Sequence, residues 1–235
     1  MPNDKKTSPW LYVGIGCAVA LGILVIAVVG VGIVGYRYAR QVGEELKDPV
    51  ARAAKVKTVL GANTIPSGYY PLMGLSIPFV LETAILSDVE EPESGGRPFE
   101  HRGFIYMNMM GASKQHQELR DFFEGRITES SMLKQQSIRM RAGDMIGRGE
   151  IKDKDRRILY VAQRGRVEMR NADIDGVTAM LLIECPGDTR ARLGIWFGPD
   201  PDPLTPVKAA NFKGSPADQD EIRSFAAHFD FCKKQ

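Results

Sequence analysis

Residues 177–197, VTAMLLIECPGDTRARLGIWF, decide the fold of this chain. Two apolar runs, VTAMLLIE and RARLGIWF, flank the tetrapeptide CPGD. The order Pro-Gly-Asp favours a tight turn, because proline presets one backbone dihedral, glycine accepts a positive φ and aspartate hydrogen-bonds its own backbone. The segment therefore predicts an antiparallel hairpin of two strands.

The residues on either side of this hairpin predict a second hairpin and a closing helix. Residues 137–147, SIRMRAGDMIG, and 156–170, RRILYVAQRGRVEMR, have the composition of strands and lie around a KDKD turn. Further along the chain, Ser215 is expected to cap a helix whose first position is Pro216. Apolar residues follow at helical spacing, which predicts that one side of this helix packs on the sheet.

The preceding part of the chain predicts more strands and one further helix. Residues 65–88 contain proline, glycine and β-favouring residues that break any helical period, and residues 103–110 read as a short strand. Ser113 can cap a helix that runs to Phe123. The order of strands, helix, two hairpins and helix predicts an α+β fold, with a mainly antiparallel sheet packed by helices on one side or both.

A charge-free segment precedes the part that folds. The 25 residues from Leu11 to Gly35 carry no charge, and a helix of that length covers roughly 37 Å against a hydrocarbon core of about 30 Å. We therefore expect a transmembrane helix over 10–38, after a short polar tail at 1–9. The run is too long for a secretory signal and the residues after it fit a cleavage site poorly, so we expect an uncleaved single-pass anchor.

A helical stalk over 39–61 is expected between this anchor and the soluble α+β domain, which would occupy 62–235. Asp48 and Pro49 supply a cap and a first-turn proline for the stalk helix, and Gly61 ends it. Within the expected anchor, Gly14, Ala18 and Gly22 form one stripe of small residues, which is compatible with a weak homodimer because two backbones could approach closely there. The simpler alternative is that glycine is common in membrane helices.

Two opposing signals bear on the side of the membrane that the domain occupies. Six basic residues within about 20 positions after the span favour a cytoplasmic domain. Cys17 lies in the span, which leaves Cys185 and Cys232 as one pair that suits a single disulfide in an oxidising compartment. Two unrelated buried thiols are the alternative. We favour an extracytoplasmic domain and keep a cytoplasmic one as the other hypothesis.

A basic region between positions 139 and 170 is the candidate surface for an anionic partner, with ten basic against five acidic residues. The residues singled out there are Arg139, Arg141, Lys152, Lys154, Arg156 and Arg157. Such a hairpin could bind anionic lipid headgroups. We favour a plainer reading, in which charges along an outer strand discourage strand-to-strand aggregation. Because aromatic residues do not interleave for base stacking, we expect no nucleic-acid partner.

Several short fragments imitate catalytic or metal-binding motifs, but each lacks an essential member. NADIDG at 171–176 matches the start of a calcium loop, yet Leu182 stands where a bidentate glutamate belongs. SMLK at 131–134 lacks its companion motifs, and GLSIP around Ser76 has Pro78 in place of the second glycine of a nucleophile elbow. The sequence therefore predicts no catalytic, cofactor-binding or metal-ligating residue.

Two stretches resemble known proteins. DIDGVTAMLLIECPGDTRARLGIWF at 173–197, followed by SFAAHFDF at 224–231, is similar to the Mog1/PsbP-like family over less than a third of the chain. That resemblance implies an α-β-α sandwich whose final strand pair leads into a C-terminal helix with an aromatic ending. LGANTIPSGYYPLMGLSIPFVLETAILSD at 60–88, after the apolar segment, resembles uncharacterised single-pass, membrane-anchored bacterial proteins. This second resemblance implies no activity.

These observations predict a protein held in the lipid bilayer by one helix, whose domain acts by non-catalytic binding or assembly with a protein partner at the membrane surface. One alternative is a membrane-anchored, hydrolase-like enzyme with a site built from scattered residues near Ser76 or the 88–102 loop. The other is an adaptor that binds anionic lipid through the basic 139–170 hairpin.

Overall fold

The structure, a computed structural model, describes residues 48–77, 80–91, 97–109, 113–127, 139–140, 144–153, 155–169 and 172–233. The expected transmembrane helix from Leu11 to Gly35 lies outside these ranges, as does the stripe of Gly14, Ala18 and Gly22. No helix within the described ranges is long and apolar enough to cross a membrane. The second of the two compact units of the chain begins at Asp48.

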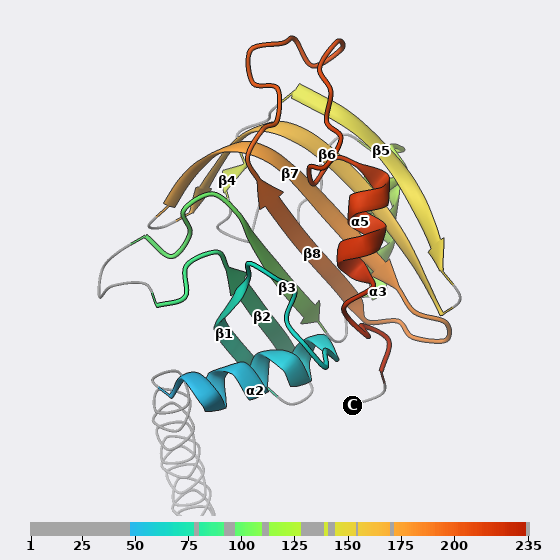
Figure 1. The fold of residues 1–235 in the computed structure, drawn as a ribbon. Coiled ribbons are helices and arrows are strands. Elements are labelled where there is room, and N and C mark those ends of the chain that lie inside the picture. The colour runs from blue at the N-terminus through green and yellow to red at the C-terminus, as the bar shows by residue number, and fades with distance from the viewer. Residues whose placement is uncertain are drawn as a thin grey trace, which may run out of the picture. The chain divides into compact units, whose positions relative to one another are not determined.

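The described strands form one sheet in which every pairing is antiparallel (Figure 1). Its strands are β1 (Tyr70–Ile77), β2 (Leu81–Ser87), β3 (Gly103–Met109), β4 (Arg139–Met140), β5 (Asp144–Asp153), β6 (Arg156–Met169), β7 (Ala172–Glu184) and β8 (Ala191–Gly198). The spatial order is β1-β2-β3-β8-β7-β6, and both β4 and β5 pair with the outer side of β6. The expected antiparallel sheet is confirmed.

Two meanders meet at the centre of this sheet. The first runs through β1, β2 and β3, and the second returns from the far edge through β5, β6, β7 and β8. They join where β3 pairs with β8, with Ile105 opposite Ile195. The hairpin predicted from residues 177–197 is present, because β7 and β8 pair on either side of the turn after Glu184.

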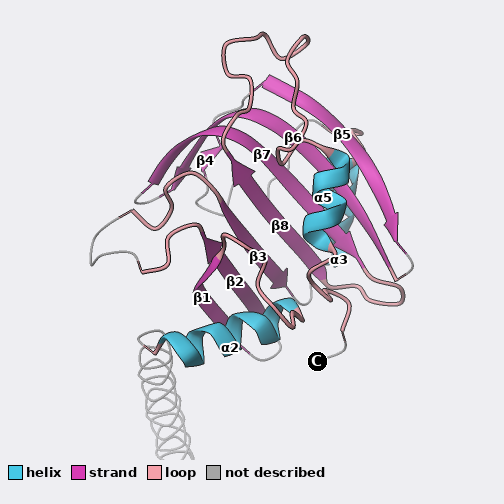
Figure 2. Cartoon of the chain, in the orientation of Figure 1, coloured by secondary structure: helices cyan, strands magenta, loops and turns pink. Residues whose placement is uncertain are grey.

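Helices cover both faces of the sheet (Figure 2). The helices α2 (Pro49–Leu60) and α5 (Gln219–Ala226) pack on one face, and α3 (Ser113–Phe123) packs on the other. Alternation along β8 separates the two cores, since Ile195 and Phe197 face α3 while Trp196 faces α5. The described unit therefore has three layers, and its fold is α+β.

The described part of the stalk expected over 39–61 forms the helix α2, which packs on the sheet, whereas residues 39–47 lie outside the described ranges. Asp48 caps the helix, since its side chain accepts the Val50 N–H at 2.9 Å. Val56 and Leu60 are fully buried in the core beneath it. Val50, at the start of the helix, is exposed, so the buried side of α2 lies in its last two turns.

The end of α2 is fixed by Gly61, which has a φ of 62° and a backbone that contacts the C-terminal segment. A Cβ at this position would collide with the carbonyl oxygen of Asp230, and a positive φ already disfavours any other residue. The folded domain therefore starts at Asp48 rather than at residue 62.

The helix α5 starts one turn later than the sequence predicts. Asp218 is the N-cap and its side chain accepts the Asp220 N–H at 3.0 Å. Ser215 instead closes a turn before the helix, because its hydroxyl accepts the Ala217 N–H and its carbonyl accepts the Asp218 N–H. Both residues have capping side chains, and the sequence alone ranked the wrong one first.

Phe225 of α5 lies at the centre of an aromatic cluster between the helix and the sheet. Its ring stacks on Trp196 with centroids 4.3 Å apart and meets Phe104 edge-on at 5.1 Å. Gly194 leaves room for Phe104, because a Cβ there would lie 3.0 Å from its ring. This cluster fastens α5 to the two central strands.

Cys185 and Cys232, which the sequence left open as a pair or as separate thiols, are joined by a disulfide in the structure. Their Cα atoms lie 5.5 Å apart across 47 positions of sequence. The bond holds the segment after α5 against the end of β7, where Phe229 and Phe231 pack into the core.

We expect loss of this disulfide to lower the free energy of unfolding by about 4 kcal/mol, the chain-entropy value for a loop of this length. The double variant Cys185→Ser/Cys232→Ser of the full chain should show this loss in urea unfolding without reductant. After reduction, the free energy of unfolding of the native chain should fall close to that of the double variant. Cys17→Ser is the matched control and should unfold like the native chain. A double variant as stable as the control would contradict the structural role of the bond.

A buried ion pair marks the turn between β7 and β8. Arg192 is 1% exposed, and its Nη2 lies 2.5 Å from the Asp188 carboxylate. Burial raises the pKa of Asp188, but hydrogen bonds from Arg190 and Arg192 outweigh burial and hold this pKa well below its usual range. The charged form of Asp188 is therefore favoured in the folded state.

Asp188→Asn should lower the free energy of unfolding by about 3 kcal/mol at pH 7, because it leaves a buried arginine without its counter-charge. Since the folded pKa is depressed, this stabilisation is present above the unfolded pKa near 4 and fades as the pH falls below it. The difference in free energy of unfolding between the native chain and the variant should thus be smaller by about 1 kcal/mol at pH 3 than at pH 7. The exposed Asp155→Asn is the control, and urea unfolding at both pH values provides the measurement. If the difference in free energy of unfolding were the same at both pH values, the depressed pKa of Asp188 in the folded state would be refuted.

Candidate functional site

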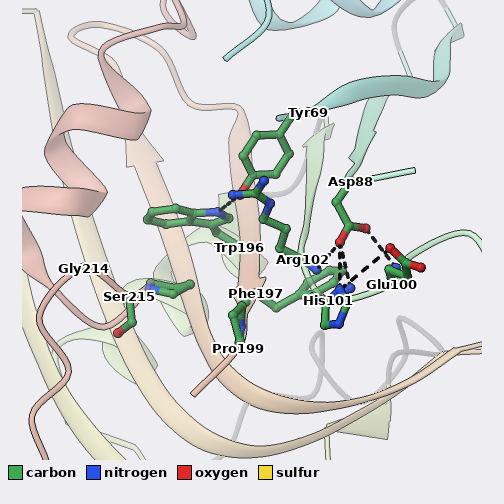
Figure 3. Close-up of a pocket in the computed structure, with 12 residues that line it drawn as sticks. Tyr69, Asp88, Glu100, His101, Arg102, Trp196, Phe197, Pro199, Gly214 and Ser215 are labelled. Atoms are coloured by element: carbon green, nitrogen blue, oxygen red, sulfur yellow. Dashed lines mark hydrogen bonds and ion pairs between the residues drawn. The ribbon is translucent and has the colours of Figure 1, made fainter. Parts of the chain in front are cut away.

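An open cleft of about 430 Å³ lies at the end of β8 (Figure 3). Its walls come from the residue before β1, from the 88–102 connection between β2 and β3, from residues 196–199 and from the 214–216 turn. These segments are far apart in the sequence and are brought together by the β2–β3–β8 pairing. Asp88 and residues 100–102, the two ends of the loop named in the enzyme hypothesis, line this cleft, whereas Ser76 does not.

Asp88 holds the 88–102 loop in place. Its carboxylate accepts the backbone N–H groups of Glu100, His101 and Arg102 at 2.9, 2.7 and 3.1 Å. Ser87 supports the same loop, because its hydroxyl donates to the Pro98 carbonyl at 2.5 Å. These bonds satisfy the carboxylate with backbone donors, so the role of Asp88 is to position the residues that follow it.

Tyr69 and Trp196 form the inner wall of the cleft. The indole Nε1 of Trp196 donates to the phenol oxygen of Tyr69 at 2.7 Å, and Phe225 backs both rings. Burial raises the pKa of Tyr69, although the Trp196 hydrogen bond and the Arg102 charge act in the opposite direction. The phenol is therefore a neutral hydrogen-bond donor at neutral pH.

Arg102 lies over the ring of Tyr69, with its guanidinium carbon 5.3 Å from the ring centroid. Figure 3 shows the Arg102 side chain running from the group of Asp88, Glu100 and His101 toward the rings of Tyr69 and Trp196. Gly68, at a φ of 75°, makes room for it, since a Cβ there would lie 2.5 Å from Nη2 of Arg102. The arginine is thus held at the cleft by stacking.

The other polar groups of the cleft do not form a nucleophile with an activating base. The Ser215 hydroxyl donates to the Phe212 carbonyl at 2.7 Å and accepts the Ala217 N–H. His101 is 69% exposed, and its Nδ1 lies 3.8 Å from Asp88 and 3.9 Å from Glu100. The geometry suits the binding of a molecule rather than the activation of a hydroxyl.

A charged cluster lies on the opposite face, around Glu184 at the end of β7. Its carboxylate is 2.6 Å from Nη2 of Arg120 and 3.2 Å from Nη1 of Arg157, and His116 lies 3.6 Å away. Burial lowers the pKa of His116, while Glu184 raises it. Within the described ranges no group of three or more side chains could hold a metal ion. The cluster ties α3 to the sheet.

In the basic hairpin expected to meet an anionic surface, the three singled-out residues whose side chains are described have partners within the molecule. Arg157 contacts the carboxylates of Glu150, Glu124 and Glu184, and Lys152 lies 3.4 Å from Glu150. Arg156 is 11% exposed and donates to a backbone carbonyl of the C-terminal segment. The side chains of Arg139, Arg141 and Lys154 lie outside the described part of the chain.

Comparison with known proteins adds no assignment to this geometry. No family model, curated protein or solved structure matches the chain.

Proposed function

We propose that this chain is a single-pass membrane protein that holds a non-catalytic binding domain at the membrane surface, outside the cytoplasm. The charge-free segment from Leu11 to Gly35 supports the anchor, because its length suits the hydrocarbon core. The Cys185–Cys232 disulfide supports the compartment, because such bonds persist where conditions are oxidising. The cleft at the end of β8 supplies the binding site.

The chemistry of the cleft is the observation that carries this proposal. Its carboxylate at Asp88 and its hydroxyl at Ser215 are bound to backbone groups, so they maintain shape. Two hydrogen-bond donors, the Arg102 guanidinium and the Tyr69 phenol, are left facing the cleft, beside aromatic walls. Concave sites with apolar walls and a few convergent polar groups are typical of ligand binding.

Neither alternative has comparable support. An adaptor for anionic lipid needs free cations, whereas Arg156 and Arg157 are engaged by carboxylate and carbonyl groups of the same domain. A hydrolase needs an activated nucleophile, and Ser76 faces Glu82 across a 3.4 Å hydrogen bond in β1 and β2, away from the cleft. The binding role is therefore the function that the geometry supports best.

The compartment can be tested by labelling thiols with an impermeant maleimide reagent in intact and permeabilised cells. Leu204→Cys, placed in a chain lacking the three native cysteines, exposes one thiol, because Leu204 is 96% exposed. We expect this thiol to react in intact cells. In the Cys17→Ser chain, Cys185 and Cys232 should react only after reduction. Labelling of Leu204→Cys only after permeabilisation would place the domain in the cytoplasm and reject this part of the proposal.

The role of the cleft can be tested in cells with a photo-cross-linking amino acid in the full chain. At position 100 the side chain lines the cleft and is 73% exposed, whereas position 204 is exposed but does not line it. We expect a discrete adduct from position 100, detected as a mass increase of the denatured chain, and none from position 204. Equal adducts from both positions, or none from either, would refute a binding role for the cleft.

A further inference from the structure

We propose that the cleft binds a carboxylate attached to an apolar body, with the Arg102 guanidinium and the Tyr69 hydroxyl as its two donors. This inference rests on the proposed role of the cleft as the binding site and names the chemistry of its ligand. It follows from four features of the described residues: a cation that forms no ion pair, a hydroxyl whose hydrogen has no acceptor, acidic neighbours that do not contact the cation, and apolar walls.

Arg102 is the cation of the site. Among the described residues no carboxylate or carbonyl accepts a hydrogen bond from its guanidinium, which instead stacks over Tyr69. A flexible exposed arginine would have no fixed place, but here Gly68 adopts a positive φ and leaves the space that the guanidinium fills. A planar fork of N–H donors held in one position matches the two oxygens of a carboxylate.

Tyr69 supplies the second donor. Its oxygen accepts the Trp196 N–H at 2.7 Å, which fixes the position of the hydroxyl group. The hydroxyl hydrogen takes no part in that bond and can be donated to another group. No group in the described part of the chain accepts that hydrogen. Because burial keeps the phenol protonated, it can donate to an anion beside Arg102.

The acidic residues around the cleft do not neutralise Arg102. Asp88 already accepts three backbone N–H groups, and no ion pair joins it to the guanidinium. Glu100 extends into solvent at 73% exposure and also forms no ion pair with Arg102. The positive charge is therefore available to a ligand, although a multiply charged anion would be disfavoured by these neighbours.

Apolar groups define the rest of the ligand. Trp196, Pro199 and Pro216 line the same cleft, and its volume of about 430 Å³ lies within the range of small-molecule sites. A carboxylate with an aromatic or aliphatic body fits these walls better than a bare inorganic anion. Both a free organic acid and the C-terminal residue of a peptide present this chemistry.

The intrinsic fluorescence of Trp196 can report occupancy directly. The chain has two tryptophans, so Trp10→Phe leaves Trp196 as the single emitter in the cleft wall. The full chain in detergent micelles is titrated with phenylacetate and phenylacetamide, with the peptide acetyl-Gly-Gly-Phe as acid and as amide, and with inorganic phosphate. We expect saturable changes with one or both carboxylates, and none with the amides or phosphate.

Matched variants assign the binding to Arg102. Arg102→Gln should weaken carboxylate binding by about tenfold or more, which corresponds to the loss of a charge-assisted, bidentate interaction. Arg102→Lys should recover part of the affinity, since it restores charge without the fork. Arg97→Gln removes the same charge from the same loop but does not line the cleft, and it should bind as the parent does.

Four outcomes would overturn the inference: equal binding of acids and amides, tighter binding of phosphate, binding that Arg102→Gln leaves unchanged, or no binding of any probe. If no probe binds but position 100 still forms its adduct in cells, the ligand class is wrong and the proposed function stands. If the carboxylates bind and no adduct forms in cells, the proposed function fails while the chemistry of the cleft holds. Binding of phenylacetate alone or of the peptide acid alone supports the inference and identifies the source.

Discussion

The pairing of β3 with β8 is the constraint on which the rest of the structure depends. It joins the two meanders into one sheet, and all eight residues of β8 are buried as a result. The same pairing sets Phe104 opposite Trp196, so the aromatic cluster beneath α5 is assembled from both meanders. One end of this strand pair carries the buried Arg192, and the other carries the cleft. The register of the β3–β8 pairing therefore determines both the packing of the core and the position of the cleft.

Local elements of this fold could be predicted from sequence where a turn or cap signal coincides with a clear pattern. The hairpin around Pro186 and Gly187 and the helix α3 are of this kind. The start of α5 was misplaced because Ser215 and Asp218 both have capping chemistry, and packing chose between them. The helix α2 was taken for a stalk because a short helix shows its buried side only when the sheet beneath it is known. The β3–β8 pairing has no local signal.

The cleft was only partly foreseeable. The sequence named the 88–102 loop as one candidate site, but the other side of the cleft is formed by Tyr69 and Trp196, which are separated from each other by 127 positions of sequence. Neither residue belongs to a motif, because their shared role is a hydrogen bond that exists only after the sheet forms. Gly68 before an aromatic residue and Arg102 at a strand start were the available signals. These two residues matter because they contact each other, and a single sequence does not show that contact.

The segment at 222–232 has a consequence for when the protein can fold. Ile222, Phe225 and Phe229 cover the central strands, and Cys232 reaches back to the end of β7. These residues leave the ribosome after every strand of the sheet, so the nascent chain exposes an uncovered apolar surface until synthesis has passed them. The described fold can therefore be completed only after this segment has been translated. For the location outside the cytoplasm that we propose, this order keeps the chain incompletely folded while it crosses the bilayer.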